Sequence, residues 1–177
     1  MKSYKPRISE ELARKKLTIQ RRFRALQVPV KIDLIHIPHY FFRLRARDQK
    51  GQMRTFCASM DALVGTFALV DDSLLEPEEL VEPEFKPRLP IEKLKGSLMQ
   101  EAKWFLKHKA RRGRGIYDLV DADSGELAWY PFWIGYHKNK DGSLGFLAID
   151  ALSGTYQAGS ARRVIIHAFL NLKSAQP

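Results

Sequence analysis

The sequence predicts an α+β fold of two tandem helix-plus-antiparallel-sheet modules with a C-terminal helix. Its 177 residues are 45% hydrophobic and 28% charged, which is typical of a globular chain. A basic, helix-like stretch precedes alternating, strand-like stretches twice along the chain. The pattern Asp-Ala-x-x-Gly also recurs, at 61–65, 121–125 and 150–154. Together these features indicate a repeated unit.

The first module is expected at residues 1–71. Ser9 is a suitable helix N-cap, and the basic helix that follows carries a thin apolar stripe. Apolar and polar residues then alternate over 30–37 and 40–47, and return strands are expected near 55–60 and 66–70.

An acidic, proline-rich connector is expected at 72–90, and the second module at 91–177. Apolar residues at spacings of three and four predict a core-facing helix stripe: Ile91, Leu94, Leu98, Ala102 and Phe105. Strands follow, with a hairpin signal at Asp141-Gly142. Ser160 can cap the C-terminal helix.

The recurring Asp and Gly residues suit backbone turns. An Asp carboxylate accepts hydrogen bonds from nearby backbone N–H groups, and Gly adopts angles that a β-carbon resists. We expect structural turns, rather than an acidic active site, at Asp61, Gly65, Asp121, Gly125, Asp150 and Gly154.

A helix followed by strands that end in Asp150-Ala151-Leu152-Ser153-Gly154 resembles the PepSY family. The resemblance covers about residues 90–158, and a weaker one covers 8–71 through Asp61-Ala62-Leu63-Val64-Gly65. It implies one helix packed on an antiparallel sheet, and an inhibitory or regulatory binding role. That family usually acts outside the cytosol, whereas this N-terminus has no apolar export signal.

Five aromatic side chains crowd one expected strand. Alternation places Trp129 and Trp133 on one face, and Tyr130, Phe132 and Tyr136 on the other. One face can be core while the other docks a partner or a ligand. These five are therefore the candidate partner-binding residues, with core packing as the alternative.

The net charge of +10 is uneven. Residues 1–54 hold 15 Lys and Arg against 4 Asp and Glu, and residues 91–114 hold 8 against 2. Such segments attract nucleic acid, an anionic membrane surface or an acidic protein, or they are merely solvated. The polyanion-binding candidates are Arg14, Lys15, Lys16, Arg21, Arg22, Arg24, Lys109, Arg111, Arg112 and Arg114.

No catalytic signature is evident. His36 and His39 would point to opposite faces of a strand, which disfavours a metal site. Cys57 and His39 are not repeated in the second copy, so Cys57 reads as a small buried residue. We expect no enzyme activity, cofactor or metal.

The single cysteine excludes an internal disulfide, and no apolar run approaches the roughly 20 residues that span a bilayer. We therefore expect a cytoplasmic protein without a transmembrane segment. The function expected is a non-enzymatic protein-interaction or regulatory module, a subunit of a larger assembly. Its aromatic sheet face would dock a protein partner while the basic helices steer by charge; the alternative is a nucleic-acid-binding protein.

Overall fold

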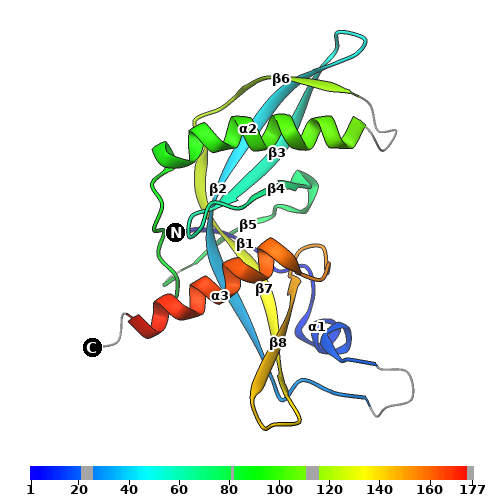
Figure 1. The fold of residues 1–177 in the computed structure, drawn as a ribbon, viewed down its shortest axis with the longest axis vertical. Coiled ribbons are helices and arrows are strands. Elements are labelled where there is room, and N and C mark those ends of the chain that lie inside the picture. The colour runs from blue at the N-terminus through cyan, green and yellow to red at the C-terminus, as the bar shows by residue number, and fades with distance from the viewer. Residues whose placement is uncertain (21–25, 81, 111–115, 175–177) are drawn as a thin grey trace. The chain divides into compact units, whose positions relative to one another are not determined.

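The computed structural model describes residues 1–20, 26–80, 82–110 and 116–174 (Figure 1). It confirms the α+β class. The helices are α1 (Glu10–Leu17), α2 (Ile91–Ala110) and α3 (Gly159–Ser174), with a short 3-10 turn η1 (Asp72–Leu74). The strands are β1 (Lys2–Tyr4), β2 (Lys31–Asp48), β3 (Met53–Asp61), β4 (Phe67–Val70), β5 (Pro77–Glu79), β6 (Tyr117–Ala122), β7 (Glu126–Lys138) and β8 (Leu144–Asp150).

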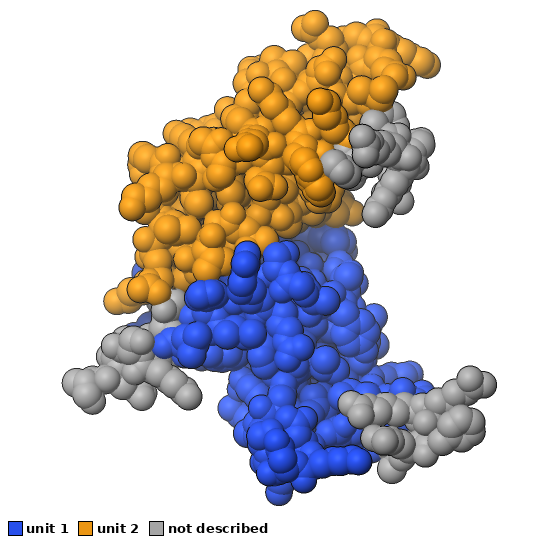
Figure 2. Space-filling model, in the orientation of Figure 1, with its two compact units in different colours: residues 1–37, 74–85, 129–177 blue, residues 38–73, 86–128 orange. Residues whose placement is uncertain are grey.

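The chain divides into two compact units (Figure 2). Unit 1 comprises Met1–Ile37, Leu74–Phe85 and Trp129–Pro177, and unit 2 comprises Pro38–Ser73 and Lys86–Ala128. Each unit thus takes residues from both halves of the chain. This division differs from the successive segments 1–71, 72–90 and 91–177 that the sequence suggested.

Unit 2 is an antiparallel sheet in the order β4-β3-β2-β6, and α2 packs across β2 and β3 (Figure 1). β2 and β3 form a long hairpin, in register from Arg47↔Met53 to His39↔Asp61. Leu94, Leu98 and Ala102 of the predicted stripe are buried against it, whereas Ile91 and Phe105 at its two ends are only half-buried. The core of unit 2 contains Phe42, Leu44, Ala58, Met60, Leu94, Leu98 and Ala102.

Unit 1 is built on the hairpin of β7 and β8, in register from Lys138↔Leu144 to Phe132↔Asp150. β1 runs parallel to β7 and antiparallel to β5. α1 packs on the hairpin through a core of Ala13, Leu17, Trp133, Ile149 and Ala151. The opposite face of the hairpin meets α3, where the Phe169 ring contacts the rings of Phe85, Tyr136 and Phe146.

The helices are therefore exchanged relative to chain order. α1 covers the hairpin from the second half of the chain, and α2 covers the hairpin from the first half. Hydrogen bonds to two alanine carbonyls hold this arrangement. Ala62 O accepts from Arg88 N (2.8 Å) and Leu89 N (2.9 Å), just before α2, whereas Ala151 O accepts from the N–H groups of residues 7 and 8 (3.0 and 2.9 Å), just before α1. Local helix patterns do not encode which hairpin a helix covers.

The expected connector also contains structure. β5 pairs with the N-terminal strand β1 from Lys2↔Glu79 to Tyr4↔Pro77, and Leu80 exchanges two backbone hydrogen bonds with Met1. No helix among the described residues has the length and apolar character to cross a bilayer.

Candidate functional site

The aromatic strand β7 is core. Trp129, Tyr130, Phe132 and Trp133 are all buried, and Tyr136 is half-buried. α1 covers one face of their hairpin and α3 the other. The expected aromatic docking face is thereby corrected: the rings lie where the chain's own helices cover them.

The polar atoms of these rings are also satisfied within unit 1. The indole N–H of Trp129 donates to Phe85 O (2.9 Å), and that of Trp133 donates to Ile8 O (2.8 Å). The Tyr130 hydroxyl donates to Asp150 Oδ2 (2.8 Å). Buried Trp and Tyr need such partners, so these bonds fix the strand in the core.

Two of the three Asp-Ala-x-x-Gly segments are matching turns. Asp61 Oδ1 accepts from Leu63 N (3.0 Å) and Val64 N (2.7 Å). Asp150 Oδ1 accepts from Leu152 N (2.7 Å) and Ser153 N (3.0 Å). Each turn ends in a glycine with positive φ, 79° at residue 65 and 71° at residue 154. The turn prediction is confirmed at both positions.

The third segment behaves differently. Asp121 lies in β6 and pairs with Arg45, whose Nε is 2.7 Å from Asp121 Oδ1. The turn is made by Asp123, whose Oδ1 accepts from Arg43 N and Gly125 N (both 3.1 Å). The role expected of Asp121 is corrected because strand pairing places it beside an arginine on β2.

Around this turn, a shallow hollow of about 360 Å³ is lined by Arg43, Arg45, Thr55, Asp121, Ala122 and Asp123. Two arginines face two carboxylates there, and one pair is already joined. The hollow therefore offers little net attraction for an anion.

The cations predicted on the first helix lie only partly within the structure. Arg14 pairs with Glu10 in the same helix (3.3 Å), and Lys15 and Lys16 lie in its last turn. Such an exposed pair weakens the attraction of Arg14 for an external anion. Arg21, Arg22 and Arg24 lie outside the described residues.

The second predicted basic segment is described even less. The backbone of Lys109 belongs to α2, but its side chain is outside the described part. Arg111, Arg112 and Arg114 lie outside the described residues altogether.

A basic surface that the sequence reading missed lies on the side of α2 turned away from the core. At about 100° of rotation per residue, six residues fall within an arc of about 100° opposite Leu98. We call this set the outward face of α2: Lys93, Gly96, Gln100, Lys103, Trp104 and Lys107. All are exposed, and the Trp104 side chain is 55% exposed. The helical spacing that predicted the core stripe also defines this face.

The electrostatics of the outward face are one-sided. Lys93, Lys103 and Lys107 make no ion pair with any residue that the structure describes. The acids of α2, Glu92 and Glu101, lie outside the arc. The face therefore presents positive charge that no carboxylate within the described ranges neutralises by an ion pair.

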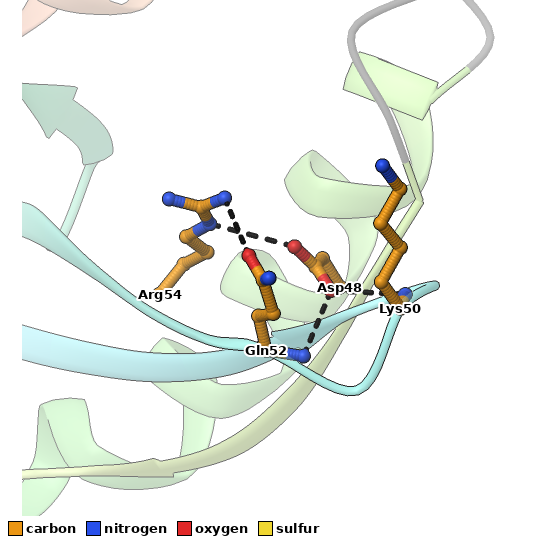
Figure 3. Close-up of polar contacts among 4 residues, drawn as sticks. All are labelled: Asp48, Lys50, Gln52 and Arg54. Carbon is orange, nitrogen blue, oxygen red and sulfur yellow. Dashed lines mark hydrogen bonds and ion pairs between the residues drawn. The ribbon is translucent and has the colours of Figure 1, made fainter.

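In contrast to the lysines of the outward face, Arg54 at the tip of the β2–β3 hairpin is paired with a carboxylate (Figure 3). Asp48 Oδ1 accepts from Lys50 N and Gln52 N (both 2.9 Å), and Arg54 Nε lies 3.4 Å from Asp48 Oδ2. Burial raises the pKa of Asp48, but these bonds outweigh it and hold the pKa below its usual range. The Lys50 ammonium group points away from the other three residues in the figure. Arg54 is thus occupied in shaping the turn.

Cys57 and His39, the possible nucleophile and base, lie apart on the β2–β3 hairpin. Burial raises the pKa of the Cys57 thiol to about 11, with Asp72 adding to the effect, so the thiol is protonated near neutrality. His39 is buried opposite Asp61, four positions along the hairpin from the Arg43↔Cys57 pair. Burial lowers the pKa of His36 and His137. Within the described ranges, no three His, Cys, Asp or Glu residues could hold a metal ion together.

Comparisons with known proteins add no information on this site. No protein-family model, no curated protein and no solved structure matches the chain. The resemblance to the PepSY family stays a prediction.

Proposed function

We propose that the protein is a non-enzymatic binding module for a polyanion, and that this polyanion is nucleic acid. The observation that supports this function is the outward face of α2. It presents Lys93, Lys103 and Lys107 to solvent, and none of the three forms an ion pair with a residue in the described part of the chain. Lysines that neutralise phosphates release counterions, which gives a favourable and salt-dependent free energy of binding.

The spacing of the lysines suits an extended, charged chain. Lys103 and Lys107 are separated by about 6 Å along the helix axis, and Lys93 lies about 15 Å before Lys103. Their long, flexible stems allow each ammonium group to reach a different phosphate. The buried aromatic strand offers no comparable surface, so the basic-helix alternative is the better supported one.

The test is a pair of charge-matched double variants. Lys103→Gln/Lys107→Gln neutralises the outward face, and Lys86→Gln/Lys95→Gln removes the same charge from exposed positions of unit 2 outside it. Binding is measured by fluorescence anisotropy with labelled oligonucleotides between roughly 50 and 200 mM salt. The outward-face variant should weaken binding at least about tenfold and reduce the salt slope by about 1.4 to 1.8.

The control variant should change affinity less than about threefold, because its lysines lie away from the contact. Equal losses in both variants would mean that only net charge matters. Wild-type protein that fails to bind any oligonucleotide at the lowest salt would refute the function.

A protein partner is a second candidate, favoured by one observation on α3. Ile166 and Leu170 are 40% and 54% exposed, one turn apart on the same helix side. Affinity purification after nuclease treatment should retain a protein that Ile166→Ser/Leu170→Ser loses and that Leu144→Ser keeps, because Leu144 is an exposed apolar residue of the same unit but lies in β8. If the wild type and both variants retain the same set of proteins, this candidate is rejected.

A further inference from the structure

Trp104 is the exposed aromatic residue on the outward face of α2. Helical spacing places it on the side of α2 that carries Lys103 and Lys107, away from the apolar stripe that α2 buries against β2 and β3. Large apolar side chains exposed at a polar surface often mark a contact with a ligand or partner. A ligand of this face should therefore offer a surface that can contact the indole as well as negative charge for the lysines.

A neighbouring aromatic ring of unit 2 supports the Trp104 indole. The rings of Trp104 and Phe105 meet edge to face at 6.4 Å between centroids. Phe105 in turn contacts Phe67 of β4 at 5.7 Å. This chain of ring contacts links the exposed indole to the core of unit 2, so stacking on it costs less side-chain entropy than stacking on an unsupported ring.

We infer that the module selects single-stranded nucleic acid, with one unpaired base stacked on Trp104 and adjacent phosphates on Lys103 and Lys107. This inference rests on the proposed function and specifies its ligand. A base in a single strand has a free π-face, and aromatic platforms beside cations are a recurrent way to bind it. In a duplex, the faces of the bases are already stacked, so a duplex gains only the charge interaction.

Other polyanions fit the face less well. An anionic membrane would attract the lysines, but the apolar stripe of α2 is buried in unit 2, so Trp104 alone could enter the interface. An acidic protein would likewise use the lysines and leave the indole without a flat partner.

The experiment uses the full chain with three probes: a labelled 15-mer of deoxythymidine, an abasic 15-mer of the same backbone, and a 15-base-pair duplex. The variants are Trp104→Ala, Trp104→Leu and Trp104→Phe, each checked for folding by circular dichroism. We expect Trp104→Ala and Trp104→Leu to weaken binding to the 15-mer by roughly 10- to 100-fold, with the salt slope unchanged. Trp104→Phe should retain most of the affinity, because it keeps an aromatic face.

The abasic and duplex probes isolate the stacking contribution. Wild-type protein should bind both about as weakly as Trp104→Ala binds the deoxythymidine 15-mer, and the variants should change neither affinity more than about twofold. Equal loss for the duplex, or a loss in Trp104→Leu no larger than in Trp104→Phe, would overturn the inference.

The outcomes also separate the inference from the function on which it rests. If Lys103→Gln/Lys107→Gln loses binding and Trp104→Ala does not, the polyanion function stands and base stacking is rejected. Binding to vesicles containing phosphatidylserine, or to polyglutamate, without binding to the 15-mer would reject both.

Discussion

Replacing Asp61 with alanine should be one of the most destabilising substitutions in the chain. The Asp61 side chain is fully buried, and its two oxygens accept from three backbone N–H groups. Those donors are Leu63 and Val64, at 3.0 and 2.7 Å from Oδ1, and Thr66, at 2.6 Å from Oδ2. Alanine removes both side-chain acceptors at once and leaves these three N–H groups without their carboxylate partner.

The magnitude follows from the number of bonds. Hydrogen bonds to a charged acceptor contribute about 1.5–3 kcal/mol each, so three bonds set an upper range of about 4.5–9 kcal/mol. Val64 and Thr66 are only half-buried, and water can reach their N–H groups after the substitution. We therefore expect Asp61→Ala to lower the free energy of unfolding by about 3–5 kcal/mol. Asp61→Asn should lose about 1–3 kcal/mol, because its NH₂ group opposes the N–H of Thr66.

The assay is urea unfolding followed by far-ultraviolet circular dichroism, with the m-value checked for two-state behaviour. Asp141→Ala is the matched control, because Asp141 accepts from Ser143 N (3.0 Å) in an exposed hairpin turn. Its effect should be much smaller, since water replaces the lost acceptor. A loss for Asp61→Ala below about 1 kcal/mol, or no larger than that for the control, would refute this account of the turn.

Three further predictions follow from the described geometry. Gly125→Ala should lower the free energy of unfolding by about 2–4 kcal/mol, because the φ of Gly125 is 80° and a β-carbon there would lie 2.9 Å from Ile91 Cδ1. Gly142 has a similar φ of 82° but lies in open space, so Gly142→Ala should lower it by only about 1–2 kcal/mol in the same assay. The alkylation rate of Cys57 should rise up to a pH of about 11, since burial raises its pKa, and a plateau near pH 9 would contradict this. Burial lowers the pKa of His36 and His137 below the ordinary 6.5, so the unfolded chain binds more protons. The free energy of unfolding should then fall as the pH drops below 6.5. The double variant His36→Gln/His137→Gln should show a weaker dependence on pH, and an unchanged dependence would mean that other groups cause it.

The sequence predicted most reliably what short-range chemistry controls. The stripe of α2 follows from helical periodicity, and Leu94, Leu98 and Ala102 are buried as expected. The turns at Asp61 and Asp150 form because each carboxylate reaches N–H groups within five residues of itself.

Local sequence patterns could not predict which distant segments pair with each other. The strand β5 in the expected connector exists because β1 lies beside it, and nothing within 72–90 signals that partner. In the same way, Asp121 has the sequence of a turn residue, yet the register of β6 on β2 places it beside Arg45. In both cases the local sequence is compatible with several structures, and a distant segment decides among them.

The candidate site was misjudged for a related reason. A strand crowded with aromatic residues suggests a surface only if one face stays open, and α3, from the end of the chain, covers the second face. The sequence pattern of α2 does not single out Trp104, because a strong core stripe dominates that helix. The same helical spacing places Trp104, together with Lys103 and Lys107, on the side opposite that stripe.

The exchange of helices explains why the two halves of the chain depend on each other. α1 has only eight residues, and isolated helices of that length are marginal in water, so its stability must come from packing on β7 and β8. Those strands begin more than 100 residues after it, and the carbonyl of Ala151 fixes its entry. The first hairpin, in turn, is covered by α2, which the carbonyl of Ala62 holds in place. Each hairpin therefore needs a helix from the other half of the chain to bury one of its faces, and the basic helix α2 is held in place by a hairpin that precedes it in the sequence.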